Sequence, residues 1–245
     1  MKKICTLLIA LWMIGLYAQK ADANQILGAI DKNMTSSTSK TVSRMVIHTR
    51  RASRTITSIN YSQGMQKYYS EYTDPPREKG TKMLKLDDKL WIYEPSTDRV
   101  IQLSGNMLRQ SLMGSDLSYE DFMEESELSK QYNAAISGEI EYDKRSCWVL
   151  ELSAKRDGIA YPKRKLYVDK ERNVALYEEL FAKSGKLLKT VSASNVSRIA
   201  NRWYPRKIVF KDALKDGKGT EFIIDEIEFD INIPERYFNR SILRK

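Results

Sequence analysis

The sequence contains few histidines and cysteines, and this shortage excludes several kinds of active site. Among 245 residues there are one histidine, His48, and two cysteines. A Ser-His-Asp triad and a histidine-ligated metal site are therefore unsupported, and no GxSxG, HExxH or P-loop motif is present. The pair Asp87-Asp88 fits a turn better than a metal site or an acid-base pair. We expect a protein that is not an enzyme and that uses no cofactor or metal.

Long apolar runs are almost as scarce, and the one present stands at the N-terminus. Lys2-Lys3 precedes an apolar stretch over residues 4–16, and Ala18 supplies a small residue for cleavage. This order is typical of a secretory signal peptide, because a membrane-spanning helix needs about 20 apolar residues. We predict a signal peptide over 1–18 and one exported, soluble domain over 19–245.

Cysteine usage gives a second constraint. Cys5 lies before the apolar stretch, whereas a lipid-attachment cysteine would follow it, so removal of the signal peptide leaves Cys147 alone. No intramolecular disulfide is then available, and the core must hold the fold. We interpret Cys147 as a small buried strand residue rather than a reactive thiol. The net charge of +9 is scattered along the chain, which favours anionic headgroups or acidic proteins over nucleic acid as partners.

One clear helix is predicted, directly after the cleavage site. Asp22 and Gln25 have the spacing of a capping box. Four apolar residues then recur at helical spacing: Ile26, Leu27, Ile30 and Met34. The serine- and threonine-rich run 35–39 ends the helix. An alternative signal cleavage after Ala23 would remove the cap, which favours cleavage after residue 18.

Strand patterns dominate the rest of the chain. Segments rich in β-branched and aromatic residues predict strands near 42–50, 54–62, 66–73, 135–142, 146–154, 163–169, 174–182, 186–193, 203–211 and 220–231. In two of them apolar and polar residues alternate, which is typical of an antiparallel sheet wetted on one face. The apolar faces are Trp148, Leu150 and Leu152 in one strand, and Ile223, Ile227, Phe229, Ile231 and Ile233 in the other. The sequence predicts a single, mainly β domain of about ten strands.

The run from Lys79 to Met123 is the most informative part of the chain. Its first half predicts three strands joined by a three-residue loop at 87–89 and a four-residue loop at 95–98. This register places six apolar residues on one face, as the floor of a ligand-binding cavity: Leu84, Leu86, Leu90, Ile92, Ile101 and Leu103. The opposite face would carry Lys85, Trp91, Tyr93, Val100 and Gln102.

The second half of this run predicts a lid over that floor. Ser118 and Asp121 have capping-box spacing, and Gly114-Ser115 would separate two short helices. Methionine side chains are flexible, so they suit a surface that repacks around a ligand. The predicted ligand-binding lid residues are Met107, Leu108, Leu112, Met113, Leu117, Phe122 and Met123. Ordinary core filling is the alternative interpretation of these residues.

Three motifs, in order, resemble the LolA family of periplasmic lipoprotein carriers. The run 90–95, Leu-Trp-Ile-Tyr-Glu-Pro after an acidic turn, is similar to that family's hairpin motif, and weaker matches follow at 166–174 and 229–234. The wider run 79–123 looks closer still to LolA-like outer-membrane lipoprotein-sorting proteins of Bacteroidota and spirochaetes. The resemblance implies a half-open antiparallel β-barrel, with an N-terminal helix and short mid-chain lid helices on its concave face. The family also carries an arginine on an early strand that locks the lid. The corresponding region here is 73–77, and the resemblance assigns this role to no residue in it.

The same resemblance implies a function. It predicts a periplasmic, non-enzymatic carrier that binds the acyl chains of lipoproteins and delivers them to the outer membrane. An inner-membrane exporter and an outer-membrane acceptor would be its partners, contact with the membrane would be transient, and the carrier would be a monomer. Two alternatives keep the fold: a binding protein for a free lipid or glycolipid that works with an envelope transporter, and a sensor of lipids or lipoproteins.

Overall fold

The computed structural model of the chain describes residues 22–49, 52–124 and 127–244. The predicted signal peptide and its cleavage site lie outside the described residues. Across these three ranges, no helix combines the length and the apolar character that crossing a membrane requires.

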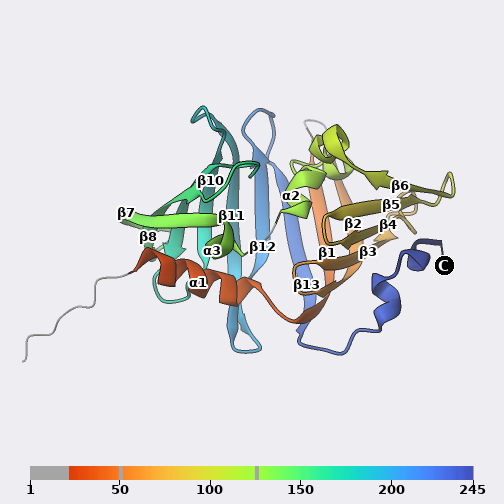
Figure 1. Cartoon of the computed structure of the whole chain (residues 1–245), viewed down its shortest axis with the longest axis horizontal. Coiled ribbons are helices and arrows are strands. Elements are labelled where there is room, and N and C mark those ends of the chain that lie inside the picture. Colours follow the sequence, from red (N-terminus) through yellow and green to blue (C-terminus); the bar gives the residue numbers. More distant parts are fainter. Residues whose placement is uncertain (1–21, 50–51, 125–126, 245) are drawn as a thin grey trace, which may run out of the picture.

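The described strands form one antiparallel sheet that curves without closing on itself (Figure 1). Neighbours follow the order β6-β5-β4-β3-β2-β1-β13-β12-β11-β10-β9-β8-β7, so β6 and β7 are the edges. The predicted half-open antiparallel barrel is confirmed, with thirteen strands in place of about ten. The strands are β1 (Thr38–His48), β2 (Ser53–Gln63), β3 (Lys67–Asp74), β4 (Lys82–Leu86), β5 (Lys89–Glu94), β6 (Arg99–Leu103), β7 (Tyr132–Tyr142), β8 (Arg145–Ala154), β9 (Lys163–Asp169), β10 (Ala175–Phe181), β11 (Leu187–Ile199), β12 (Arg202–Asp212) and β13 (Thr220–Phe229).

Short helices line one side of this sheet. Figure 1 shows α1, α2 and α3 in front of the sheet, on its concave side, with the C-terminal helical turns beside β3 and β4. The helices are α1 (Ala23–Met34), η1 (Gly105–Arg109), η2 (Leu112–Gly114), α2 (Tyr119–Met123), α3 (Leu128–Gln131), η3 (Glu235–Phe238) and η4 (Arg240–Arg244). The predicted N-terminal helix and the short mid-chain helices are therefore present on the expected face.

Helix α1 forms where its cap and its periodicity predict it. The Asp22 side chain caps it by accepting a hydrogen bond from the backbone N–H of Asn24 at 2.8 Å, rather than from that of Gln25 as the predicted capping box requires. Ile26, Leu27 and Ile30 are buried in a cluster that includes leucines of β8 and β9. Burial of this apolar face, rather than helix propensity, holds a helix of twelve residues in place.

Strand β8 is covered on both faces, because its two sets of alternating side chains enter different clusters. Leu150 and Leu152 pack with α1, as the alternation predicts. Cys147 packs with Val174 and Leu176 on the other face and is fully buried. Burial raises the pKa of the Cys147 thiol, which keeps it in its neutral form. The interpretation of Cys147 as a buried strand residue is confirmed.

The hairpin between β4 and β5 corrects the predicted register. Its loop has two residues, Asp87-Asp88, rather than three. Leu84 therefore pairs with Trp91 and not with Ile92, as the three-residue loop would require. The first loop residue has a φ of 53°, a left-handed conformation that aspartate tolerates better than most residues. Since side chains alternate along a strand, this one-residue difference places Leu84 and Leu86 on the face opposite Leu90.

The second predicted loop, 95–98, is confirmed. Leu90 pairs with Leu103 and Ile92 pairs with Ile101, as expected. These four residues share the concave side of the sheet, whereas Trp91 and Tyr93 pack on the outer side with the leucines of β4. The predicted face of Lys85 is also wrong. Lys85 pairs with Leu90 and lies on the concave side, away from Trp91.

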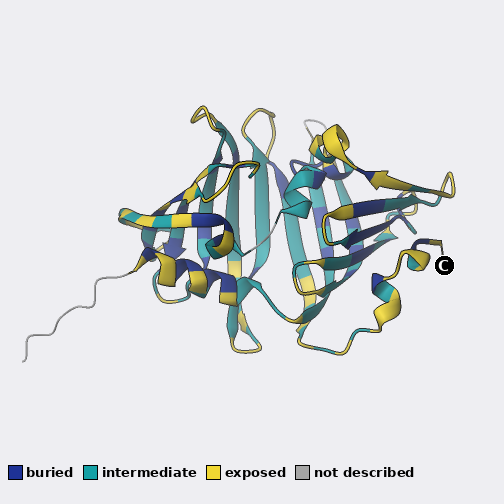
Figure 2. Ribbon diagram, in the orientation of Figure 1, coloured by how far each residue is buried: buried dark blue, intermediate teal, exposed yellow. Residues whose placement is uncertain are grey.

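The C-terminal segment, residues 235–244, explains why the tighter register is stable. It lies over the outer face of β3, β4 and β5, where Leu243 is fully buried against Leu84 and Trp91. The tighter turn brings these two side chains next to each other under Leu243. Figure 2 shows the same distribution, with buried residues concentrated in the strands and exposed residues at the loop tips.

A β-bulge in β13 corrects a second predicted face. The pairing between β1 and β13 skips Asp225, which accepts two hydrogen bonds from Arg44, each of 2.7 Å. A bulge shifts the alternation by one residue. Ile224 before the bulge and Ile227 after it therefore face the concave side, and Ile223 faces outward. The predicted common face is wrong for Ile223, and it ends at Phe229 because Ile231 and Ile233 lie beyond the strand.

Candidate functional site

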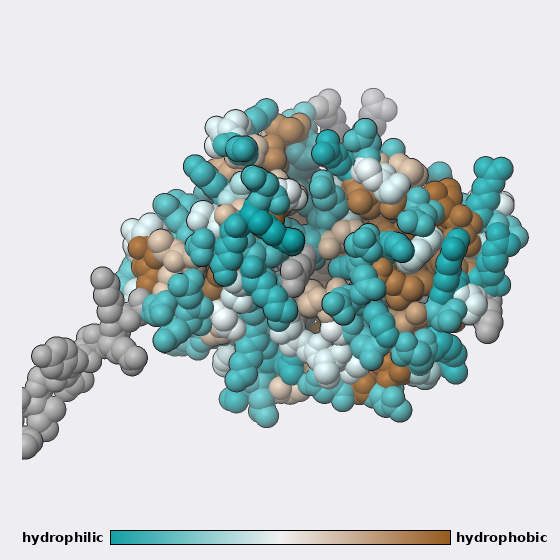
Figure 3. Space-filling model, viewed as in Figure 1, coloured by the Kyte–Doolittle hydropathy of each residue, from teal (hydrophilic) through white to brown (hydrophobic). Residues whose placement is uncertain are grey.

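A cavity of about 440 Å³ lies on the concave side of the sheet. Residues from β1 to β4, β12 and β13 form its floor and walls, and residues from the segment after β6 roof it. This volume falls within the range of about 300–1,000 Å³ that is usual for small-molecule sites. Figure 3 shows this side of the molecule, with hydrophobic side chains gathered on the half that holds β1–β6.

The walls of the cavity are largely apolar. They include side chains from β1, β2 and β4, from the central strands β12 and β13, and from the roof: Met45, Ile56, Met83, Ile208, Phe210, Phe222, Ile224, Leu112, Leu117 and Phe122. Phe210 and Phe222 meet edge to face, with 5.7 Å between ring centroids. Such a lining favours the apolar part of a ligand.

The predicted cavity floor does not line this cavity. Leu90, Leu103 and Ile92 pack under the roof, where its own side chains fill the space above β5 and β6. Ile101 is 42% exposed near the edge of the sheet. The two leucines of β4 lie on the outer face because of the corrected register. None of the six residues is among the described residues that line the cavity.

The predicted lid residues are placed more nearly as expected. We call residues 105–124 the lid segment. Leu112, Leu117 and Phe122 line the cavity, while Leu108, Met113 and Met123 pack against the same core. Met107 is 36% exposed and joins neither group. The segment has three short helical turns rather than two helices, because extended backbone at Gln110 separates η1 from η2, and residues 115–118 separate η2 from α2.

Polar contacts attach the lid segment to both halves of the sheet. Asp116 accepts hydrogen bonds from the Thr220 hydroxyl at 2.8 Å and from the Asp212 backbone N–H at 3.1 Å. Arg54 on β2 donates to the Met113 carbonyl and pairs with Glu78 at 2.9 Å. The predicted capping box at the start of α2 is confirmed by reciprocal hydrogen bonds between Ser118 and Asp121.

Five buried or half-buried charged residues join the end of the lid segment to β9, β10 and β11. Asp121 forms an ion pair with Lys189, and Glu124 pairs with Arg164 at 2.5 Å. Glu178 lies 3.6 Å from the same guanidinium. We call these five residues the lid ion cluster. Its members come from four separate elements, so they hold the lid segment against the far half of the sheet.

Two tyrosines complete this cluster. The Tyr161 hydroxyl donates to Asp121, and the Tyr132 hydroxyl accepts a hydrogen bond from Arg164 Nε at 2.9 Å. The Tyr132 hydroxyl donates in turn to the Tyr161 carbonyl at 3.0 Å. The buried charges therefore have both opposite charges and hydrogen-bond partners, which is the condition for tolerating them away from water.

The surroundings of the cluster shift the pKa values of its carboxyl groups. Burial alone would raise the pKa of Asp121, but the charge and hydrogen bond of Lys189, helped by Tyr161 and Ser118, hold it below its usual range. Burial raises the pKa of Glu178. The charge of Arg164 opposes this rise, and the Glu124 carboxylate adds to it. Asp121 is therefore the ionised anchor of the cluster at neutral pH.

The lid ion cluster stands between two cavities. A second cavity of about 210 Å³ lies beside α1 and β9–β12. Met34, Ile208, Asp121 and Glu124 line both cavities. The ion pairs of Asp121 with Lys189 and of Glu124 with Arg164 thus lie where the two cavities meet.

Sequence reasoning missed Arg164 and Lys189. A signal was available for the arginine: it alternates with Leu166 and Val168 in β9, so it stands on an otherwise apolar face, and both neighbours are fully buried. A charge at such a position predicts a buried partner. Its hydrogen-bond partners, Tyr132 and Glu124, are more than thirty residues away in the sequence, so no local pattern identifies them.

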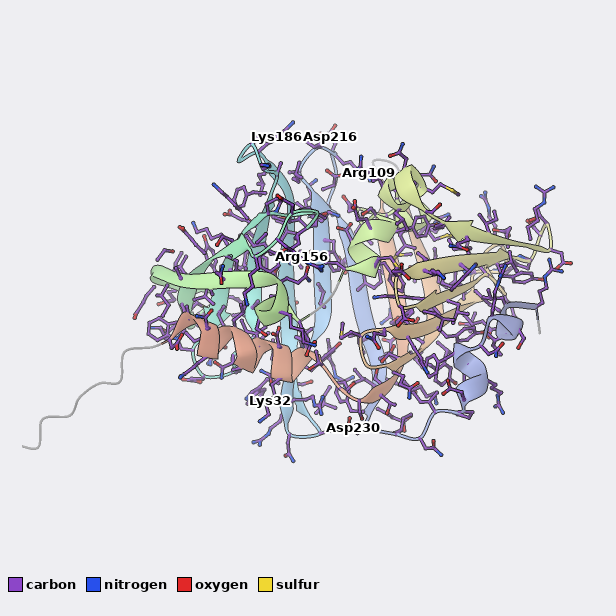
Figure 4. All side chains as sticks on the ribbon, viewed as in Figure 1. Lys32, Arg109, Arg156, Lys186, Asp216 and Asp230 are labelled. Atoms are coloured by element: carbon purple, nitrogen blue, oxygen red, sulfur yellow. The ribbon has the colours of Figure 1, made fainter. Side chains whose placement is uncertain are left out.

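Charges of both signs border the concave face. Figure 4 shows Lys186 and Asp216 at hairpin tips at one end of the molecule, Lys32 and Asp230 at the other, and Arg156 near the middle, on the loop between β8 and β9. Among the described residues, no group of three or more histidine, cysteine, aspartate or glutamate side chains has the arrangement of a metal site.

Comparisons with known proteins agree with this architecture. A family model described as "Uncharacterized protein" matches residues 64–245. The chain belongs to this family. Among curated protein sequences, no significant match was found.

Three solved structures share the fold over nearly their whole length. A DUF1329 family protein from Desulfovibrio piger has 23% identity and a TM-score of 0.81, over 90% of this chain and 97% of its own. A domain from Vibrio parahaemolyticus assigned to outer membrane lipoprotein sorting has 22% identity and a TM-score of 0.78, over 91% and 98%. A LolA superfamily protein from Nitrosomonas europaea has 24% identity and a TM-score of 0.72, over 91% and 100%. The resemblance to LolA-like proteins is confirmed at the level of the fold.

Proposed function

We propose that the protein is a periplasmic, non-enzymatic carrier that binds acyl chains of lipoproteins in the concave cavity and delivers them to the outer membrane. The observation that carries this proposal is the apolar-walled cavity of about 440 Å³ under the lid segment. Two of the structures with this fold belong to a lipoprotein-sorting domain and to the LolA superfamily, which supports the same kind of ligand.

Burial of an acyl chain would supply enough free energy for a transient complex. Each buried methylene contributes about 0.8 kcal/mol, so roughly ten methylenes contribute about 8 kcal/mol before the costs of ordering and association. A carrier must also release its ligand. The lid segment is held by charges and hydrogen bonds as well as by apolar contacts, and this mixture offers a route for opening it at a membrane.

The predicted signal peptide and two partner proteins each have a role in this function. Residues 1–18 would direct export and be removed, and the mature chain would receive its ligand from an inner-membrane exporter and pass it to an outer-membrane acceptor. The predicted lid residues that line the cavity, Leu112, Leu117 and Phe122, would contact the acyl chain directly.

A cavity-filling substitution tests the site. Ile208 on β12 lines both cavities, so Ile208→Trp should lower the affinity for a fluorescent fatty-acyl probe at least about tenfold, which is about 1.4 kcal/mol. Val209→Trp, on the opposite face of the same strand, is the matched control and should bind as the wild type does. Equal affinity of both variants, with unchanged melting temperatures, would show that acyl chains do not occupy this cavity.

The nature of the ligand needs a second measurement. Native mass spectrometry of the protein purified from a bacterial periplasm should show a bound species with the mass of a lipidated peptide. A bound free lipid or glycolipid would instead favour the alternative of a binding protein that works with an envelope transporter. Purification of the protein without any bound lipid, together with failure of the probe to bind, would contradict both functions.

A further inference from the structure

One side of the cavity is polar, although nothing in an acyl chain requires polar contacts. The floor over β1, β2 and β3 carries hydroxyl, phenol and amide groups: Thr41, Ser43, Ser58, Asn60, Tyr68 and Ser70. Ser43, Ser58, Asn60 and Ser70 are at least nine-tenths buried. The opposite wall, from β12, β13 and the lid segment, is largely apolar, with Asp121 and Glu124 at the end of the lid segment. The cavity therefore has two chemically different sides.

The side chain of Asn60 organises the polar side. Its amide nitrogen donates to Thr41 Oγ1 and Ser43 Oγ, each at 3.0 Å. Its amide oxygen accepts from the Tyr68 hydroxyl at 2.9 Å and from Ser70 Oγ at 2.7 Å. All the donors and acceptors of the amide are thus used, which fixes the hydroxyl groups around it in defined positions.

Hydrogen-bonding capacity remains on this network. A hydroxyl group has one donor and two acceptor positions. Ser43 and Ser58 share one hydrogen bond of 3.2 Å, so one of their two O–H groups is left over. Thr41 accepts from the amide, and no hydrogen bond between described side chains uses its own O–H. The floor thus keeps at least two donors, and several acceptor positions, within the cavity lining.

A bare alkyl chain would be a poor match for such a floor. It would remove these hydroxyl groups from water and return no hydrogen bond, and each unsatisfied buried polar group costs free energy. An uncharged ester, amide or hydroxyl group placed over the network would satisfy it. Two positive and two negative side chains also line the cavity, so the site as a whole has no marked preference for an ion: Lys67, Lys85, Asp121 and Glu124.

Resting on the proposed function, we propose that the cavity takes the neutral glyceride part of its ligand as well as an acyl chain. The ester and hydroxyl groups of an acylglycerol would lie over the Asn60-centred network, and the chain would lie against Ile208, Phe210 and Phe222. The substrate class is therefore an acylglycerol group, whether on a lipidated protein or in a free lipid, and not an isolated acyl chain.

Competition with a fluorescent fatty-acyl probe tests this in the wild-type protein. Monolauroylglycerol and dodecane share a chain length and differ in the polar group. We expect monolauroylglycerol to bind about tenfold more tightly, which corresponds to about 1.4 kcal/mol. Equal affinities would overturn the inference and leave the proposed acyl carrier intact. Failure of both competitors and of the probe would instead overturn the proposed function.

Two variants locate the effect. Ser43→Ala with Ser58→Ala removes both hydroxyl groups of the shared pair and with them one of the two unused donors, while the Asn60 amide keeps Thr41 as an acceptor and both donors to its oxygen. This double variant should reduce the preference for monolauroylglycerol to about threefold or less and leave the affinity for dodecane unchanged or higher. Thr55→Val, on the outer face of β2, is the matched control and should keep the full preference. An unchanged preference in the double variant would contradict the assigned site.

The two sources of an acylglycerol group can be compared directly. A diacylglyceryl-modified cysteine peptide and free diacylglycerol both carry the proposed group, and the inference requires that at least one of them displaces the probe. Tighter binding of the peptide would assign the site to lipidated proteins, and tighter binding of diacylglycerol would assign it to free lipids. Displacement by lauric acid but by neither glyceride would contradict the inference.

Discussion

At the scale of single residues, Lys189 and Asp121 connect the lid segment to the sheet. Both side chains are less than one-tenth exposed, so each neutralises a charge that would otherwise be buried alone. A buried ion pair contributes little net stability compared with an apolar pair, but loss of one partner is costly because the other charge remains buried. The pair is therefore a sensitive position at which to test whether the lid segment is held electrostatically.

We expect Lys189→Met to lower the free energy of unfolding by about 3–5 kcal/mol, since Asp121 would lose its opposite charge in a buried place. Chemical denaturation measures this change. Lys186→Met removes an equal charge at an exposed hairpin tip (Figure 4) and should change stability by less than about 0.5 kcal/mol. Similar effects of the two substitutions would show that the buried pair does not hold the lid segment.

The lowered pKa of Asp121 predicts a particular pH dependence. Because its pKa in the folded protein lies below the usual value of 3.8, ionised Asp121 stabilises the fold above that value. This contribution declines as the pH falls below about 3.8 and through the folded-state pKa. The stability difference between wild type and Asp121→Asn should be constant near neutral pH and shrink under acid, as measured by denaturation at a series of pH values.

The exposed turn residue Asp88 provides the control for this titration. Asp88→Asn should differ little from wild type at any pH, because the side chain is exposed and has no role in the lid ion cluster. A stability difference for Asp121→Asn that stayed the same from neutral pH to about pH 2 would show that the carboxylate of Asp121 is not stabilised by its charge.

At the scale of elements, the lid segment combines core packing with attachment by polar groups. Leu112 and Leu117 are buried with residues of β1, β2 and β4, so part of the segment is core, as the alternative interpretation holds. The same two residues line the cavity, so the segment is also its roof. These two roles are compatible, because a side chain can pack against core residues on one side and border the cavity on the other.

Leu112→Glu tests whether this roof governs ligand binding. The new carboxylate would stand at the cavity wall, where it can draw water in, so the affinity for a fluorescent fatty-acyl probe should fall at least about tenfold. Thermal melting should still show a cooperative transition, at a lower temperature. Met107→Glu, at the exposed end of the same segment, is the control and should change neither quantity. Unchanged affinity in Leu112→Glu would exclude a roof function, and complete unfolding would favour plain core.

The elements themselves were largely predictable, and their detailed register was not. The α1 helix, the ten strands predicted from β-branched and aromatic segments, and the three strands of the run 79–123 follow from local patterns. The β4–β5 register depended on whether the loop is 87–88 or 87–89, and both fit the local sequence. The two-residue loop places Leu84 beside Trp91, where both pack under Leu243. Leu243 is about 150 residues further along the chain, so no local pattern contains this contact. The bulge at Asp225 is similar, since its bond to Arg44 spans the chain.

At the scale of the whole molecule, the C-terminal segment covers an outer face that would otherwise be open. Residues 235–244 lie across β3, β4 and β5, and Lys82 Nζ donates to the Ile242 carbonyl at 3.4 Å. The β1–β13 pairing places the first and last strands next to each other in the middle of the sheet, so the segment that follows β13 can reach this face. The sheet near β6 is thus covered on one side by the lid segment and on the other by the C-terminus.

We expect Leu243→Ala to lower the free energy of unfolding by about 2–5 kcal/mol, because a fully buried leucine would be replaced by a cavity. Leu214→Ala, at a residue that is 63% exposed, should change it by less than about 0.5 kcal/mol. Denaturation curves measure both. If Leu243→Ala matched Leu214→Ala, the C-terminal segment would not contribute to the stability of the sheet.

The sequence by itself determined the fold class, because period-two alternation and turn residues act over a few neighbours and specify an antiparallel sheet. It also determined the N-terminal helix and the roof position of the lid segment, through capping and apolar spacing. Only the tertiary structure decided which residues line the cavity. The polar floor around Asn60 and the lid ion cluster join residues from separate strands, and their energies depend on burial and distance, which exist only after the sheet has curved.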